Sequence, residues 1–123
     1  MHLRTSDLPV SMDVAGARMQ NIEWGAMVIN YVELPAGADL SPMLEGLPGD
    51  KCQCPHWGYV LKGAVNLRYS DGSEEKTSAG EVFYWPSGHT GWVKEDTVFM
   101  DFSPAEEFKV LAEHLAKKTA QAQ

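Results

Sequence analysis

The stretch CQCPHWGYVLKG, residues 52–63, is the part of the chain that decides the fold. Its second half is rich in aromatic and β-branched residues, and it ends at a Lys-Gly turn. Successive side chains of an extended strand point to opposite faces. His56 and Gly58 would then share one face, and Trp57 and Tyr59 the other. The stretch therefore predicts a β-strand that presents a histidine on one side.

Short segments of the same kind surround this strand. They are separated by Gly, Pro and Asp-Gly turns at about ten-residue spacing, which is typical of an all-β sandwich or barrel. The stretch 39–51 holds two prolines and two glycines and is expected to be a loop. The expected strands are 26–34, 56–63, 64–70, 73–78, 82–86, 89–93 and 97–103.

The end of the chain has a different pattern. Ser103 followed by Pro104 resembles an N-cap and the first position of a helix. Phe108, Leu111 and Leu115 then recur at helical spacing. We expect one domain, residues 1–123, in which a barrel of about 17–102 is followed by a single C-terminal helix of about 104–118.

Composition excludes several classes of function. The chain of 123 residues has a formal net charge of −7, which is the wrong sign for binding nucleic acid. No apolar run approaches the ~20 residues that span a bilayer, so no membrane association is expected. The first residues lack the hydrophobic core of a secretory signal. We expect a cytoplasmic protein with reduced thiols.

The pentapeptide CQCPH (52–56) holds both cysteines and one of the four histidines at alternate positions. A metal site, a disulfide, a reactive thiol and core packing are all open interpretations. A disulfide between adjacent same-face cysteines would span ~6.6 Å between Cα atoms, near the upper limit. Free cysteines are often buried as small hydrophobes. A reactive thiol would need a depressed pKa, which a nearby histidine could cause.

The segments PHWGYVLKG (55–63) and AGEVFYWPSGH (79–89) resemble the two conserved motifs of the cupin superfamily. The first motif has the form H-x-H, three or four residues, E, six residues, G; the second has the form G-x5-P-x-G-x-x-H. The resemblance extends over about residues 50–102. It implies a small β-barrel, or jelly roll, whose mouth often binds a divalent metal and a small organic molecule.

The first motif departs from the family pattern. Counting back from Gly63 puts His56 at the family's glutamate. The family's paired histidines fall either on Asp50 and Cys52 or on Cys52 and Cys54. The metal ligands implied by the resemblance therefore cannot be copied over residue by residue.

The second motif departs as well, because position 91 is a glycine and His89 lies two residues earlier. In a straight strand, positions 52 and 56 lie ~13 Å apart, so a bend at Pro55 is needed for both to share an ion. Cys54 belongs to both closer pairs and is expected to be the central donor. The candidate metal ligands are Cys52, Cys54, His56 and His89.

Thiolate and imidazole donors favour a divalent transition metal, zinc or iron, over magnesium or calcium. Two functions stay open. Three protein ligands and an exchangeable water would favour a metal-dependent enzyme, whereas four ligands and no general base would favour a non-catalytic binding or sensing module. No catalytic residue is identified by the sequence.

Two further expectations concern the face of the barrel strand. Gly58 should leave room beside His56 for a small-molecule ligand. The aromatic content is high for this length, so we expect a homodimer that pairs edge strands or buries the face carrying Trp57 and Tyr59.

Overall fold

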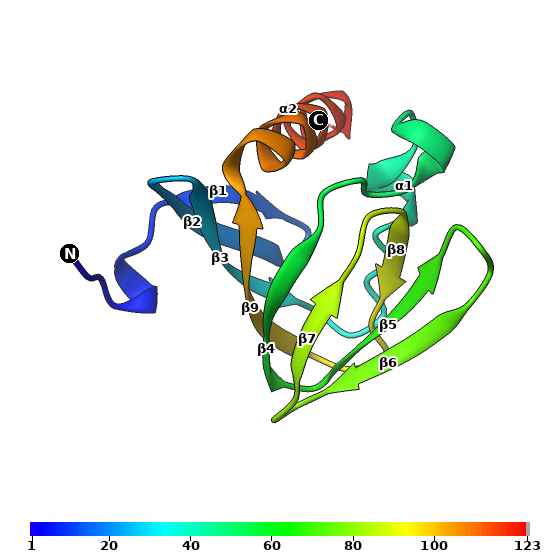
Figure 1. The fold of residues 1–123 in the computed structure, drawn as a ribbon, viewed down its shortest axis with the longest axis horizontal. Coiled ribbons are helices and arrows are strands. Elements are labelled where there is room, and N and C mark those ends of the chain that lie inside the picture. The colour runs from blue at the N-terminus through cyan, green and yellow to red at the C-terminus, as the bar shows by residue number, and fades with distance from the viewer. Residues whose placement is uncertain (123) are drawn as a thin grey trace.

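The computed structural model describes residues 1–122, which form two antiparallel sheets and one long helix (Figure 1). The larger sheet has the order β1 (Val10–Val14), β2 (Ala17–Trp24), β3 (Met27–Leu34), β9 (Thr97–Pro104), β4 (His56–Lys62) and β7 (Val82–Trp85). The smaller sheet has the order β6 (Glu74–Ser78), β5 (Ala64–Tyr69) and β8 (His89–Trp92). The all-β prediction with one C-terminal helix is confirmed.

The seven expected strands are all present, and their observed ends differ from the expected ends by no more than one residue. The barrel begins earlier than residue 17, because β1 pairs with β2 across a turn at Ala15 and Gly16. Both turn residues have positive φ, 52° and 87°, which is the conformation of a two-residue hairpin turn. β1 is mostly exposed and contains polar residues, so its apolar pattern is too weak for the strand to be predicted from the sequence.

The helical segments differ from expectation in two places. Residues 39–51 contain the short helix α1 (Ser41–Leu44) and a 3₁₀ turn, Pro48–Asp50; a second 3₁₀ turn, Thr5–Asp7, precedes β1. Helix α2 (Ala105–Ala122) is longer than the expected 104–118. Ser103 does not cap it, because Ser103 belongs to β9 and its hydroxyl donates to Asp101 Oδ1 at 2.9 Å.

The core lies between the two sheets. Val60, Val65, Leu67 and Phe99 are buried there. Figure 1 shows α2 lying across one end of the larger sheet, above β1 to β3. Its Phe108 joins the same core, so the helix closes that end of the barrel.

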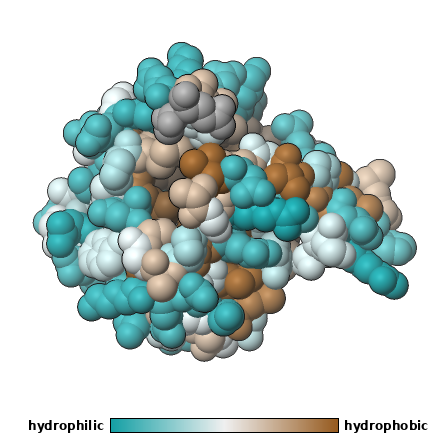
Figure 2. All heavy atoms as spheres, turned by 180° about the vertical axis from the view of Figure 1, so that it is seen from behind, coloured by the Kyte–Doolittle hydropathy of each residue, from teal (hydrophilic) through white to brown (hydrophobic). Residues whose placement is uncertain are grey.

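The face of β4 alternates as predicted. His56 and Val60 are buried, whereas Trp57 and Tyr59 are 43% and 44% exposed. Trp57 stacks on Tyr84 of β7 with ring centroids 5.0 Å apart, so the outer face of the larger sheet carries exposed aromatic side chains. Seen from behind, the surface has several separate apolar patches among hydrophilic side chains (Figure 2). No helix in residues 1–122 is long and apolar enough to cross a bilayer.

Candidate metal centre

Cys52 and His89 are joined through their backbones. Cys52 N donates to His89 O at 2.8 Å, and His89 N donates to Cys52 O at 3.2 Å. Gly88 N also donates to Cys52 O, at 2.8 Å, from a backbone with φ of 87° that suits glycine. The turn before β8 therefore holds the thiol and the imidazole on the same side of the chain.

His56 reaches the same point from another strand. It is the first residue of β4 and pairs with Trp85 of β7, which leads into the turn before His89. Its Nε2 lies 3.5 Å from Cys52 Sγ, and its ring centroid lies 5.2 Å from that of His89. The candidate donor atoms of Cys52, His56 and His89 all lie within 4.8 Å of one another, and all three residues are buried. The structure thus brings together three of the four candidate ligands.

The hydrogen bond of His89 determines which of its nitrogens is free. Its Nδ1 lies 2.7 Å from Pro86 O. A carbonyl oxygen only accepts, so Nδ1 carries the proton and Nε2 keeps a lone pair.

His56 is held in the same tautomer by a longer chain of hydrogen bonds. Its Nδ1 lies 2.7 Å from Ser103 Oγ, and Ser103 donates its only proton to Asp101 Oδ1. Ser103 therefore accepts from His56 Nδ1, which leaves Nε2 as a lone-pair donor. Asn30 Nδ2 also donates to Asp101, at 2.7 Å. Partners of this kind orient metal-ligating histidines and raise their basicity.

Burial determines the protonation states. It lowers the pKa of His56 to about 4, and burial followed by the neighbouring His56 lowers the pKa of His89 to about 4. Both imidazoles are therefore neutral at pH 7. Burial raises the pKa of Cys52 to about 12, so without a cation the thiol keeps its proton and is a poor nucleophile. Burial also raises the pKa of Asp101 to about 6, against the hydrogen bonds from Asn30 and Ser103.

Solved structures with the same architecture are numerous, although sequence similarity is low. No protein-family model matches the sequence, and none of the curated proteins is similar to it. KdgF from Halomonas sp. is 21% identical, with a TM-score of 0.62 over 85% of this chain and 93% of KdgF. The polyketide cyclase RemF from Streptomyces resistomycificus is 19% identical, with a TM-score of 0.62 over 85% of this chain and 78% of RemF.

A mutant of oxalate decarboxylase OxdC from Bacillus subtilis is 15% identical, with a TM-score of 0.63 over 83% of this chain. The chain covers only 28% of that enzyme's length. These structures are cupin-fold proteins. The chain has the cupin fold. At these identities the likeness concerns the fold alone, and the expected resemblance to cupins is confirmed at that level.

Within the cupin barrel, Cys54 lies outside the group of three donors. It is buried, but its Sγ lies 3.5 Å from Pro55 O, and its sulfur is not among the clustered atoms. The bend expected next to Pro55 is present, because β4 begins only at His56 and the chain bends at Cys54. The bend brings the Cys52 sulfur to 3.5 Å from His56 Nε2, whereas Cys54 was the donor expected at the centre of the group. Both cysteines are free thiols.

The expectation for Gly58 is wrong. A Cβ at this position would collide with Met100 O and with the Phe83 ring, which stacks on Trp85 at a centroid distance of 3.6 Å. Gly58 therefore permits close packing of β4 against β9 and the Phe83 ring, and leaves no space for a ligand.

Sequence reasoning missed Asp101 and Ser103. Residues 97–103 alternate in burial, with Thr97, Phe99, Asp101 and Ser103 all buried. A carboxylate at an inward position of a barrel strand is rarely left without partners. That alternation was the signal that could have identified Asp101 as part of the site.

A cavity of about 110 Å³ opens beside the three donors. Asn30, Cys52, His56, His89 and Asp101 form its polar wall. The other walls are almost entirely apolar and include Val65, Leu67, Phe99, Met19 and Leu44. The cavity can hold a few heavy atoms of an organic molecule, with one polar contact region at the donors.

Proposed function

We propose that this cupin barrel binds a divalent transition metal ion through Cys52, His56 and His89 and a small organic molecule in the adjoining cavity. One observation carries the proposal: the candidate donor atoms of Cys52, His56 and His89 are all buried and lie within 4.8 Å of one another. The hydrogen bonds of the two imidazoles support it, because each leaves its Nε2 unprotonated.

The donor chemistry favours zinc or iron. Oxalate decarboxylase from Bacillus subtilis, a structural neighbour, has Mn(II) centres. A thiolate donor shifts the preference here towards softer ions, and zinc accepts both thiolate and imidazole donors. Because the thiol must stay reduced, the proposal includes a cytoplasmic location.

A metal-dependent enzyme is the function that fits the site best. Three protein donors leave a position open on a four-coordinate ion. When bound there, a divalent ion would polarise an oxygen atom of the organic molecule. The chain's own contribution is to fix the imidazoles through Pro86, Ser103 and Asp101, and to exclude water with apolar walls.

A non-catalytic binding module is the second candidate, and one observation favours it. Asp101 is the carboxylate among the residues that line the cavity, and its Oδ1 already accepts hydrogen bonds from Asn30 and Ser103. These bonds give Asp101 an orienting role through Ser103 and His56, and no second carboxylate within residues 1–122 lines the cavity to pair with it in acid–base chemistry. In this version the site binds its ligand without transforming it.

Metal analysis of the purified protein tests the proposal. Protein produced in medium containing zinc, iron and manganese should carry about one ion per chain, because the three donors form a single site. His89→Ala should lower the content strongly, whereas His114→Ala, a histidine outside the donor group, should not. Wild-type protein that neither retains nor rebinds any of these ions would overturn the proposal.

A further inference from the structure

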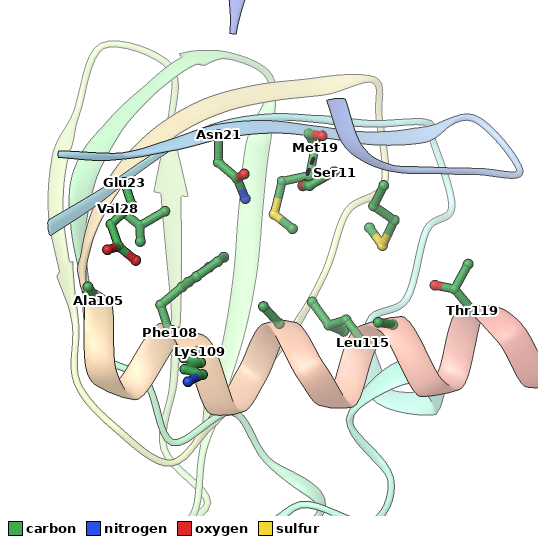
Figure 3. A pocket seen from close by; sticks show the side chains of 13 residues that line it. Ser11, Met19, Asn21, Glu23, Val28, Ala105, Phe108, Lys109, Leu115 and Thr119 are labelled. Atoms are coloured by element: carbon green, nitrogen blue, oxygen red, sulfur yellow. Dashed lines mark hydrogen bonds between the residues drawn. The ribbon is translucent and has the colours of Figure 1, made fainter. Parts of the chain in front are cut away.

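A groove of about 460 Å³ lies between α2 and the strands β1 and β2 (Figure 3). Figure 3 shows Glu23, Val28 and Ala105 at one end of it and Thr119 at the other. Ala105, Ala112 and Ala116 lie along the side of α2 that lines the groove. Their small side chains leave this space unfilled beneath the helix.

The groove adjoins the cavity at the metal donors. Four side chains line both spaces: Met12, Met19, Phe108 and Leu115. A single layer of side chains therefore separates them, and two members of that layer are methionines, whose unbranched side chains adapt readily. Movement of Met12 or Met19 would join the groove to the inner cavity.

The volumes of the groove and of the inner cavity indicate how a ligand would be divided between them. Pockets for organic ligands are typically about 300–1,000 Å³. The inner cavity of about 110 Å³ falls below this range, and the groove of about 460 Å³ falls within it. A molecule whose reactive end lies at Cys52, His56 and His89 would therefore extend into the groove.

The walls indicate the chemistry of such a molecule. Met19, Phe108 and Leu115 supply an apolar lining, and Thr119 Oγ1 is buried without a hydrogen-bond partner in residues 1–122. The polar residues on the groove walls are Ser11, Asn21, Glu23, Lys109 and Thr119. At the inner end, a dication, the Cys52 thiolate and the Asp101 carboxylate sum to zero charge. A neutral oxygen atom keeps that balance, whereas a second carboxylate would add an unpaired buried charge.

We infer that the groove beneath α2 binds the apolar tail of an elongated molecule that ends in a neutral oxygen group: an alcohol, aldehyde or ketone. The inference rests on the proposed metal site for the position of the head. The groove alone determines the position of the tail. Binding should therefore depend on α2 residues that touch no metal donor.

Calorimetric titration of the zinc-loaded protein with 1-octanol and with ethanol tests this. The six additional methylenes of octanol should tighten binding at least about thirtyfold if they are buried in the groove. Ala112→Trp, which fills the groove, should remove that gain and leave zinc affinity unchanged. Ala120→Trp is the matched control at an exposed position of the same helix, and it should retain the gain.

Octanoate tests the charge argument, and it should bind more weakly than octanol. If octanol binds no more tightly than ethanol while zinc is bound, the inference about the groove is overturned and the proposed metal site is not affected. If zinc does not bind but Ala112→Trp still weakens octanol binding, the inference about the groove holds and the proposed metal site fails.

Should Ala112→Trp lose cooperative melting, Ala116→Leu, at an exposed position lining the groove, takes its place. A dimer that Ala112→Trp dissociates would assign the groove to a second subunit and overturn the inference.

Discussion

Ser103 links Asp101 to His56 through two hydrogen bonds. Its hydroxyl oxygen lies 2.7 Å from His56 Nδ1, and the hydroxyl donates to Asp101 Oδ1 at 2.9 Å. Replacing Ser103 with alanine would free His56 to rotate and to change tautomer. Loss of such an outer partner should lower metal affinity about 10–100-fold. Competition with a chromophoric chelator measures this change.

The control for this variant is Ser73→Ala, which removes a hydroxyl that donates to Asp71 Oδ1 at 2.6 Å in the exposed turn between β5 and β6. It should leave metal affinity unchanged. Equal affinities for Ser103→Ala and the wild type would show that the hydrogen bond does not orient His56.

Cys52→Ala and Cys54→Ala form a matched pair, because both thiols are buried and free. Only the Cys52 sulfur belongs to the donor group. Its loss should weaken metal binding more than the roughly 10–100-fold expected for an outer partner. Cys54→Ala should retain wild-type affinity. Cobalt(II) substitution checks this directly, because the sulfur-to-cobalt absorption band should vanish in Cys52→Ala alone; the reverse result would restore Cys54 as the ligand.

Metal binding should release about one proton per ion at pH 7, since a ligating thiol must give up its proton. The pKa of Cys52 is about 12 and those of His56 and His89 are about 4, so only the thiol carries a proton to lose. As pH falls from 8 to 6, the apparent affinity should fall about tenfold per unit. Calorimetry in two buffers of different ionisation enthalpy counts the protons, and a count of zero would exclude a Cys52 thiolate.

Much of the fold could be predicted because strands and turns leave local signals. Alternation from His56 onwards and the glycine turns mark the strands correctly. The donor group depends on contacts far apart in the chain. The position of Cys52, and not Cys54, beside the two histidines follows from the backbone pairing of Cys52 with His89 and from a bend before β4. Ser103 has the local pattern of a helix cap, and only the pairing of β9 with β3 and β4 keeps it in a strand beside His56.

The exposed aromatic face supports a final prediction. Trp57, Tyr84 and Phe102 are 43%, 53% and 43% exposed, and the strand register makes Trp57 the partner of both others. Large exposed apolar patches typically mark interaction surfaces, and most oligomers use the same patch on both subunits. We expect a homodimer through this face.

Light scattering at ~100 µM should give twice the chain mass of 13.6 kDa, since stable dimers associate well below that concentration. Trp57→Glu should reduce the mass to that of one chain, because it places a charge at the centre of the face. Val110→Glu is the matched control: Val110 is 61% exposed on α2, outside the aromatic face. A wild-type protein that stays monomeric at this concentration would contradict the prediction, and equal dissociation by both variants would move the interface to another surface.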